Sequence, residues 1–302
     1  MCGIGGIIHL KRARIDNLEN KLGAINELQK HRGPDGHNFW VSETSCMGFA
    51  HQRLAIIDLN TGSQPMTNNL GYTICFNGEI YNYRSFGDYK SDGDCIIDLY
   101  HKLGENFVTQ LDGEFAICLV DFKNNKLIIS TDTFACKPLW YEFKGDKFCI
   151  ASYNSQLVGL DFTNGTKLFA NTTKVYNLKN LKQISEITNT TFDINQHKTS
   201  YDGWLRAFEN SIKKRTANTV QGMFVGMSSG YDSGAIACEL TKQNVSFKAY
   251  SITNNENDKI LKERFHIIKN VESFNITPTE YERIKLSVSR NCEPFEYKGY
   301  NI

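Results

Sequence analysis

The sequence lacks several features that mark whole classes of protein, and each absence narrows the possibilities. Charge of one sign is not in excess, because 34 basic and 33 acidic residues leave a net charge of +1. This balance argues against a general binder of nucleic acid or of a membrane surface. No apolar run approaches the roughly 20 residues that span a bilayer, and the first residues lack the pattern of a secretory signal. We therefore expect a cytoplasmic protein whose partners include neither nucleic acid nor a membrane.

Paired cysteines are missing as well. The nine cysteines are an odd number, and no two of them form a C-x-x-C pair. This scatter fits neither a disulfide framework nor a zinc site, and it suits a reducing compartment. We expect most of the cysteines to be small buried side chains.

Cys2 is the exception, because it follows the initiating methionine. Removal of Met1 ahead of the small residues Cys2 and Gly3 would leave a thiol and an α-amine on one residue. An unperturbed α-amine has a pKa of roughly 8, and a thiol one of about 8.5. The amine can therefore take the thiol proton near neutral pH, directly or through a water. Cys2 would then be a nucleophile with its own base.

Short apolar segments separated by Asn, Gly and Asp turns predict a β-rich first half. The expected strands are Gly3–Leu10, Met47–Asp58, Tyr72–Ile80, Phe115–Phe122, Lys126–Asp132 and Phe148–Ser152. Apolar residues at helical spacing predict helices at Ile15–Lys30 and Asp94–Leu103. Sheets with helices outside them indicate a layered α/β sandwich.

The pattern changes after a polar stretch rich in Asn and Thr at 185–200, which we interpret as a linker. The elements expected after it are a helix from Trp204 to Ile212, a strand at Met223–Met227, a helix at Gly234–Gln243 and a strand at Phe247–Ile252. This order opens a doubly wound nucleotide-binding domain. We therefore expect two domains, at 2–190 and at 200–302.

Four short blocks follow Cys2 within the first hundred residues. They are His31-Arg32-Gly33-Pro34-Asp35-Gly36, His51-Gln52-Arg53-Leu54-Ala55-Ile56-Ile57-Asp58, Asn77-Gly78-Glu79-Ile80-Tyr81-Asn82-Tyr83 and Ser91-Asp92-Gly93-Asp94. Each block alone is a weak signal, because Asn-Gly also marks hairpins, and a single Arg or Asp also serves as a surface charge or a loop cap. In this order after Cys2, the blocks resemble the class II glutamine amidotransferases, specifically the asparagine synthetase branch. The resemblance implies an N-terminal-nucleophile αββα sandwich.

The resemblance also implies a role for each site residue in glutamine hydrolysis. Cys2 would be the nucleophile. The Asn77 side chain and the Gly78 N–H would stabilise the oxyanion, and a donor of this kind is typically worth about 2.7–4 kcal/mol. The residues that would bind glutamine are Arg53 at its carboxylate, Glu79 and Asp92 at its ammonium group, and the backbone around Leu54 and Ile56. Because an α-amine can act as the base, we interpret His31 as structural and His51 as a strand residue.

A second motif lies between the first strand and the helix of the C-terminal half. Ser228-Ser229-Gly230-Tyr231-Asp232-Ser233 resembles the pyrophosphate loop Ser-Gly-Gly-x-Asp-Ser of ATP-dependent adenylating enzymes. Small residues let the backbone wrap a phosphate, and the following helix adds N–H groups. By resemblance, the ATP-binding residues would be Ser228, Ser229, Gly230, Asp232 and Ser233, with Ile252 beside the adenine. Magnesium would accompany the pyrophosphate, and its ligands stay unassigned. Ser229 replaces the second glycine, which requires a negative φ or absorbed strain.

Other positions also depart from the family pattern. Thr131 and Ala135 stand where an Arg-Asp-x-x-Gly-x-Lys-Pro-Leu block has Arg and Gly, although Lys137-Pro138-Leu139 is kept. Tyr153 stands where the family has a glutamate. A later family loop, which carries much of the ATP, magnesium and aspartate recognition, does not occur before Ile302. We therefore expect a complete glutaminase half and an incomplete synthetase half.

By resemblance, the reaction depends on ATP. Aspartate is activated as an adenylate, and ammonia released from glutamine attacks it to give asparagine, AMP and pyrophosphate. Alternatives are a stand-alone glutaminase, a subunit whose synthetase site is completed by a second chain or a homodimer partner, and a regulatory or assembly protein without turnover. Class II amidotransferases that make phosphoribosylamine or glucosamine phosphate lack a pyrophosphate loop. Whether aspartate or another carboxylate is the acceptor stays open at this point. We expect that this chain alone does not make asparagine.

Overall fold

The structure, a computed structural model, describes residues 1–195 and 197–291. The chain divides into two compact units, Met1–Asn195 and Gln196–Ile302. Each unit has its own β-sheets and its own buried apolar residues.

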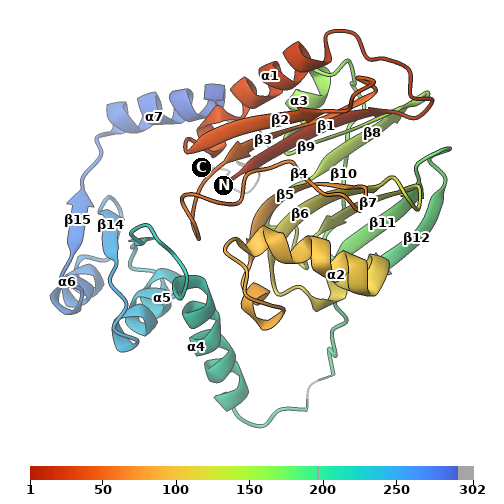
Figure 1. The fold of residues 1–302 in the computed structure, drawn as a ribbon. Coiled ribbons are helices and arrows are strands. Elements are labelled where there is room, and N and C mark those ends of the chain that lie inside the picture. The colour runs from red at the N-terminus through yellow and green to blue at the C-terminus, as the bar shows by residue number, and fades with distance from the viewer. Residues whose placement is uncertain (196, 292–302) are drawn as a thin grey trace. The chain divides into compact units, whose positions relative to one another are not determined.

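The first unit contains two six-stranded sheets that lie face to face (Figure 1). The strands of one sheet are β1 Gly3–His9, β2 Gly36–Val41, β3 Met47–Arg53, β8 Trp140–Lys144, β9 Lys147–Ala151 and β10 Thr166–Lys167, in the order β10-β8-β9-β1-β3-β2. The strands of the other are β4 Met66–Thr67, β5 Tyr72–Ile80, β6 Gly113–Asp121, β7 Lys126–Thr131, β11 Thr172–Asn177 and β12 Gln183–Thr188, in the order β12-β11-β7-β6-β5-β4. Neighbouring strands are antiparallel in both sheets.

Helices cover the outer faces of both sheets (Figure 1). On the first sheet lie α1 Leu18–Leu28 and α3 Asn154–Val158, and on the second lies α2 Cys95–Leu103. Short 3₁₀ turns occur at Lys30–Arg32, Tyr83–Ser85, Asp92–Asp94 and Gly104–Gln110. The apolar stripe of α1 packs on the first sheet, and that of α2 packs on the second. The space between the sheets is filled by a third apolar cluster. These layers confirm the expected αββα sandwich.

Several boundaries differ from the expected ones. β3 ends at Arg53, five residues before Asp58, because the chain turns there to build a pocket wall. The polar stretch at 185–200 is not linker throughout, since Gln183–Thr188 forms β12 and pairs with β11. This strand was missed because its exposed side chains lack an apolar alternation. Five cysteines are buried and free, as expected, whereas Cys136 and Cys238 are exposed and Cys292 lies outside the described residues.

The described part of the second unit is built around a small parallel sheet. Its elements are α4 Asp202–Thr216, β13 Phe224–Gly226, α5 Tyr231–Lys242, β14 Lys248–Ile252, α6 Asp258–Ile267, β15 Val271–Phe274 and α7 Pro278–Asn291. The strand order is β13-β14-β15, with α5 and α6 as the crossovers. The helix expected at Gly234 begins earlier, at Tyr231, directly after the extended Gly230. Within the described ranges no helix is both long and apolar enough to cross a membrane.

Candidate active site

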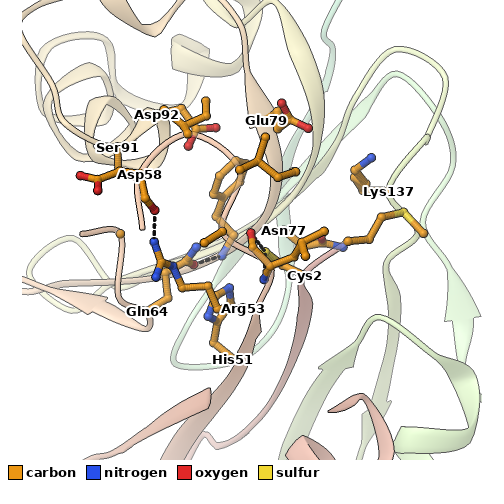
Figure 2. Close-up of a pocket in the computed structure, with 18 residues that line it drawn as sticks. Cys2, His51, Arg53, Asp58, Gln64, Asn77, Glu79, Ser91, Asp92 and Lys137 are labelled. Carbon is orange, nitrogen blue, oxygen red and sulfur yellow. Dashed lines mark hydrogen bonds between the residues drawn. The ribbon is translucent and has the colours of Figure 1, made fainter. Parts of the chain in front are cut away.

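A pocket lies at the end of the sandwich where β1 begins and β3 ends (Figure 2). All eight residues that the resemblance assigned to glutamine hydrolysis line it, namely Cys2, Arg53, Leu54, Ile56, Asn77, Gly78, Glu79 and Asp92. They come from the residue before β1, from β3 and the loop after it, from β5, and from the 3₁₀ turn at Asp92–Asp94, so segments up to ninety residues apart meet there. The fold therefore brings this whole set together.

Two strands on opposite sheets build the pocket in layers. Residues two apart on a strand point to the same face, so alternate residues of β3 and β5 face the space between the sheets. From the core outwards these are Phe49 and Cys75, then His51 and Asn77, then Arg53 and Glu79. The first pair belongs to the apolar core, the second is buried and polar, and the third is charged. The second and third pairs line the pocket.

The Cys2 thiol is held against the end of β3. Its Sγ accepts a hydrogen bond from the Leu54 N–H at 3.3 Å and lies 3.6 Å from the Leu54 carbonyl oxygen. The Arg32 Nε donates to the Cys2 carbonyl at 2.8 Å, and the Arg32 guanidinium lies over the Tyr153 ring. Burial raises the pKa of the thiol, and the Leu54 N–H opposes this rise. Burial also lowers the pKa of the chain's α-amine, an effect to which the Arg32 and Lys137 cations add. In the structure this amine belongs to Met1, and the lowered pKa favours its neutral form, the form that can accept a proton.

The His31–Gly36 block braces the chain just beyond β3. The Asp35 N–H donates to the Arg53 carbonyl at 3.1 Å, and the Asp35 carboxylate accepts from the Ala55 N–H at 2.7 Å. Gly33 lies so close that a Cβ there would be 2.3 Å from the Arg53 carbonyl carbon. The close approach of the two backbones explains why residue 33 is glycine. The block also holds the backbone on both sides of Leu54, whose N–H donates to Cys2 Sγ. His31 donates or accepts at 2.9 Å with the Tyr153 hydroxyl, a contact that fits a structural role.

Asn77 and Gly78 form the candidate oxyanion site. Asn77 is fully buried, and neither its Nδ2 nor its Oδ1 has a hydrogen-bond partner in the described structure. Figure 2 shows Asn77 and Cys2 together at the centre of the pocket. At Gly78 a Cβ would lie 2.0 Å from the Glu114 carbonyl oxygen, so only glycine fits this stretch of β5. A buried side-chain amide without a partner in the described structure, such as that of Asn77, is suited to stabilising an oxyanion beside a thiol.

Arg53 has a second task that the sequence did not reveal. Its guanidinium donates to the carbonyls of Leu59 at 3.0 Å, of Asp58 and of Thr61. Three of its five N–H groups therefore hold the loop at 58–61 that walls the pocket. The other two make no hydrogen bond with the part of the chain that the structure describes.

Asp92 and Glu79 place two carboxyl groups on the same pocket. Asp92 is buried, and its Oδ2 accepts a hydrogen bond from the Ile80 N–H at 2.8 Å. Burial raises the pKa of Asp92 to about 7, and the Glu79 carboxylate adds to the rise. Two carboxyl groups on one pocket wall favour binding of an ammonium group.

Lys137 is a pocket residue to which no sequence motif assigned a role. The Asp132 carboxylate shapes its turn by accepting the backbone N–H groups of Phe115, Phe134, Cys136 and Lys137. The Lys137 Nζ pairs with Glu114 Oε2 at 2.9 Å. Ala135 adopts a left-handed φ of 50°, where the family pattern has glycine. The Lys137-Pro138-Leu139 block, which is kept from the family pattern, was the sequence feature that could have indicated a role for Lys137.

The second motif forms the expected loop between β13 and α5. The Ser228 Oγ lies 2.9 Å from the Ser233 Oγ and accepts from the Gly230 N–H at 3.2 Å. Arg264 donates to the Ser228 and Gly230 carbonyls. Ser229 does not have a positive φ, so its side chain replaces glycine without left-handed strain.

The Glu256 carboxylate accepts hydrogen bonds from both donor groups of Ser229, its backbone N–H and its hydroxyl. Glu256 Oε2 accepts from the Ser229 N–H at 2.6 Å and from its hydroxyl. These hydrogen bonds lower the pKa of Glu256. Gly226 pairs with Tyr250, so Ile252 lies at the same carboxyl edge of the sheet as the loop, and its side chain is exposed. Among the residues described, no group of three or more His, Cys, Asp or Glu side chains could hold a metal ion.

Comparisons with known proteins point to one family. Residues 1–167 match the family described as glutamine amidotransferase domain. Asparagine synthetase B [glutamine-hydrolyzing] of Escherichia coli (strain K12) is 29% identical over 262 residues, which are 80% of this chain and 45% of that protein. Asparagine synthetase [glutamine-hydrolyzing] 2 of Bacillus subtilis (strain 168) is 36% identical over 151 residues, 47% of this chain and 20% of that protein. The chain spans less than half the length of these curated relatives.

A solved structure, the glutamine phosphoribosylpyrophosphate amidotransferase from B. subtilis, aligns with a TM-score of 0.48 at 16% identity, covering 87% of this chain and 70% of that one. The match to the amidotransferase family covers more than half of the chain. The chain therefore belongs to the class II glutamine amidotransferases of the asparagine synthetase type.

Proposed function

We propose that this protein hydrolyses glutamine in the pocket around Cys2 and that the ammonia serves ATP-dependent amidation of aspartate, as the names of its relatives suggest. The observation that carries the first step is the buried Asn77 amide, which has no partner in the described structure and shares its pocket with the Cys2 thiol. The guanidinium of Arg53 and the carboxyl groups of Glu79 and Asp92, which line the same pocket, complement the charged end of an amino acid.

The reaction begins once Met1 is removed and the α-amine belongs to Cys2. The amine takes the thiol proton, and Sγ attacks the side-chain amide carbon of glutamine. The Asn77 Nδ2 and the Gly78 N–H donate to the oxyanion. The ammonium returns its proton to the leaving nitrogen, ammonia departs, and water hydrolyses the thioester to glutamate. The Leu54 N–H keeps Sγ in place throughout.

The first test combines intact-mass analysis with a glutaminase assay on the purified chain. We expect a mass without Met1 and release of glutamate and ammonia in equal amounts. A second assay follows asparagine and pyrophosphate from aspartate, ATP and either glutamine or ammonia. Glutamate release without any asparagine in either reaction is the result that we expect for this chain alone, and robust formation of asparagine would contradict that expectation.

The loop at 228–233 is proposed to hold the phosphates of ATP, which would activate the acceptor carboxylate as an adenylate. The donor set fits an anion, because the Glu256 carboxylate already binds the N–H and the hydroxyl of Ser229. The Ser228 and Ser233 hydroxyls and the first turn of α5 would complete the site. A phosphate must compete with Glu256 for Ser229.

We expect Glu256→Gln to strengthen ATP binding. Displacing a neutral amide from Ser229 costs less than displacing a carboxylate, and a difference of about 1.4 kcal/mol corresponds to roughly tenfold in Kd. Calorimetry with ATP and magnesium measures this directly. Glu263→Gln, which removes an exposed carboxylate from the neighbouring helix α6, is the matched control and should leave Kd unchanged. Equal or weaker binding by Glu256→Gln would contradict the competition.

We expect glutamine binding to weaken as the pH falls through about 7. Below this value Asp92 becomes neutral and no longer attracts the ammonium group. Between pH 8 and pH 6 the Kd should rise by roughly tenfold, the limit for one group with a pKa near 7. Calorimetry on Cys2→Ala measures binding without turnover. Asp92→Asn should bind weakly at both pH values, and Asp88→Asn, an exposed control, should behave like the parent.

Asp92→Asn should also be more stable than the parent protein at high pH. The pKa of Asp92 is 3.8 in its reference state and about 7 in the fold. The folded protein therefore binds the proton more tightly, and stability is lost as the pH rises through this range. Asp92→Asn should raise Tm at pH 8 and not at pH 4. A lower Tm of Asp92→Asn at pH 8 would contradict the inference that the buried Asp92 carboxylate destabilises the fold.

A further inference from the structure

Three buried polar atoms in the pocket have no hydrogen-bond partner in the described structure. They are the His51 Nε2, the Asn77 Nδ2 and the Asn77 Oδ1. His51 is 2% exposed and Asn77 is fully buried. Leaving one such atom unsatisfied costs about 1–3 kcal/mol, so a cluster of them in a native pocket marks a place where they satisfy one another, a water or a ligand.

The two side chains belong to the same layer of the pocket. His51 lies two residues after Phe49 on β3, and Asn77 lies two residues after Cys75 on β5. Because Phe49 and Cys75 belong to the cluster between the sheets, His51 and Asn77 point into the same space. The Cys75 Sγ lies 3.6 Å from the carbonyl oxygen of Ala50, which brings the two strands together one residue before His51. Figure 2 shows both side chains at the pocket that holds Cys2.

The proposed chemistry requires one of the two orientations of the Asn77 amide. With Nδ2 towards the substrate, the amide donates to the oxyanion. With Oδ1 there, it would repel the negative charge. The correct orientation leaves Oδ1 in need of a donor. Two cations of the pocket have other tasks, since Lys137 pairs with Glu114 and the Arg53 N–H groups that do not hold the 58–61 loop are proposed to bind the substrate carboxylate.

His51 can supply that donor. Burial lowers the pKa of His51 to about 3, so the ring is neutral and carries one N–H. At such a pKa the ring is too weak a base to activate Cys2. With its proton on Nε2, the ring pairs with Oδ1 and not with the amide's own N–H groups, which then face away from it.

We propose that His51 is the positioning residue of the oxyanion site: its Nε2–H donates directly to Asn77 Oδ1 when glutamine is bound and so keeps Nδ2 turned towards the substrate. This inference rests on the proposed hydrolysis of glutamine and deepens it. His51 acts through Asn77 and does not itself touch the reacting atoms.

The test begins with His51→Leu and His51→Gln. In His51→Leu the Asn77 amide should lose its fixed orientation, and kcat should fall by about 10-fold to 100-fold, with KM within about twofold of the wild type. This fall is smaller than the one expected when an oxyanion donor is removed altogether. Gln carries an N–H₂ close to the position of Nε2 and should restore most of kcat. Thermal unfolding should place His51→Leu close to the wild type, whereas a purely structural histidine would show a lower Tm in both variants. His37→Leu, a change on β2 outside the pocket, is the control.

A double-mutant cycle with Asn77→Ala isolates the coupling. Once the amide is gone there is nothing to orient, so adding His51→Leu should lower kcat by less than about twofold. Full multiplication of the two single effects would overturn the inference. Nitrogen NMR of histidine-labelled protein adds a readout independent of activity, because the inference requires a neutral His51 with its proton on Nε2.

The outcomes separate the two proposals. A wild type no faster than Cys2→Ala would overturn the glutaminase itself. An active wild type with a multiplicative cycle, or a His51 ring protonated on Nδ1 alone, would overturn only the role of His51.

Discussion

Cys2→Ala is expected to abolish glutamine hydrolysis, lowering kcat by about 10³-fold or more. The variant loses the only atom of the pocket that forms the covalent bond in the proposed reaction. It keeps the α-amine, Asn77 and Gly78, and a small side chain at residue 2 should still permit removal of Met1. Steady-state release of glutamate measures the loss. Because Leu54 is the hydrogen-bond partner of Cys2 Sγ among the described residues, the fold and the affinity for glutamine should change little.

The control for this experiment is Cys136→Ala. Cys136 is exposed, belongs to the same unit and does not line the pocket, so its removal tests general thiol effects. We expect it to retain full activity. Intact mass must accompany each assay, since the mechanism requires the amine of residue 2. Equal activity of Cys2→Ala and wild type, or an active protein that retains Met1, would contradict the proposed nucleophile.

Asn77→Ala and Arg53→Ala are expected to fail in opposite ways. Removing an oxyanion donor should lower kcat by about 10²–10³-fold with little change in KM. Arg53 is proposed to bind the substrate carboxylate equally in the ground and transition states, so its loss should raise KM and largely spare kcat. Initial rates over a range of glutamine concentrations separate the two effects. The reverse pattern would show that the two roles are exchanged.

Arg53 needs an additional variant because it also holds the loop at 58–61. Arg53→Lys keeps the charge and loses the planar fork. If carboxylate binding dominates, Arg53→Lys should recover only part of the lost affinity while both variants keep a similar Tm. A large fall in Tm would assign the effect of the Arg53 variants to the loop at 58–61.

Asn77→Ala also needs a control. Asn60→Ala removes an amide from an exposed residue of that loop and serves this purpose.

Much of the first unit could be predicted from the sequence because its signals are local. Helical spacing of apolar residues located α1 and α2 to within a few residues, and the strand at Tyr72–Ile80 coincides with β5. Polar strands could not be found in this way. β2 and β12 are largely exposed and lack an apolar alternation, so only pairing with β3 and β11 makes them strands.

The candidate site shows the same division. The resemblance of the motif blocks to the amidotransferases named the side chains that are proposed to bind and cleave glutamine. Their meeting in one pocket depends on the pairing of β1 with β3 and on the packing of one sheet upon the other. No local pattern encodes a distance between strands that lie far apart in the sequence.

The sequence by itself thus determined the chemistry available to this protein, and the tertiary structure decided the state of each group. Asp92 is an ordinary carboxyl group in the sequence, and burial beside Glu79 raises its pKa to about 7. Lys137 became a pocket residue only because Asp132 shapes its turn. Glu256 reaches Ser229 across 27 positions of the chain. Desolvation and long-range contacts arise when the chain folds, which is why composition and spacing could not reveal them.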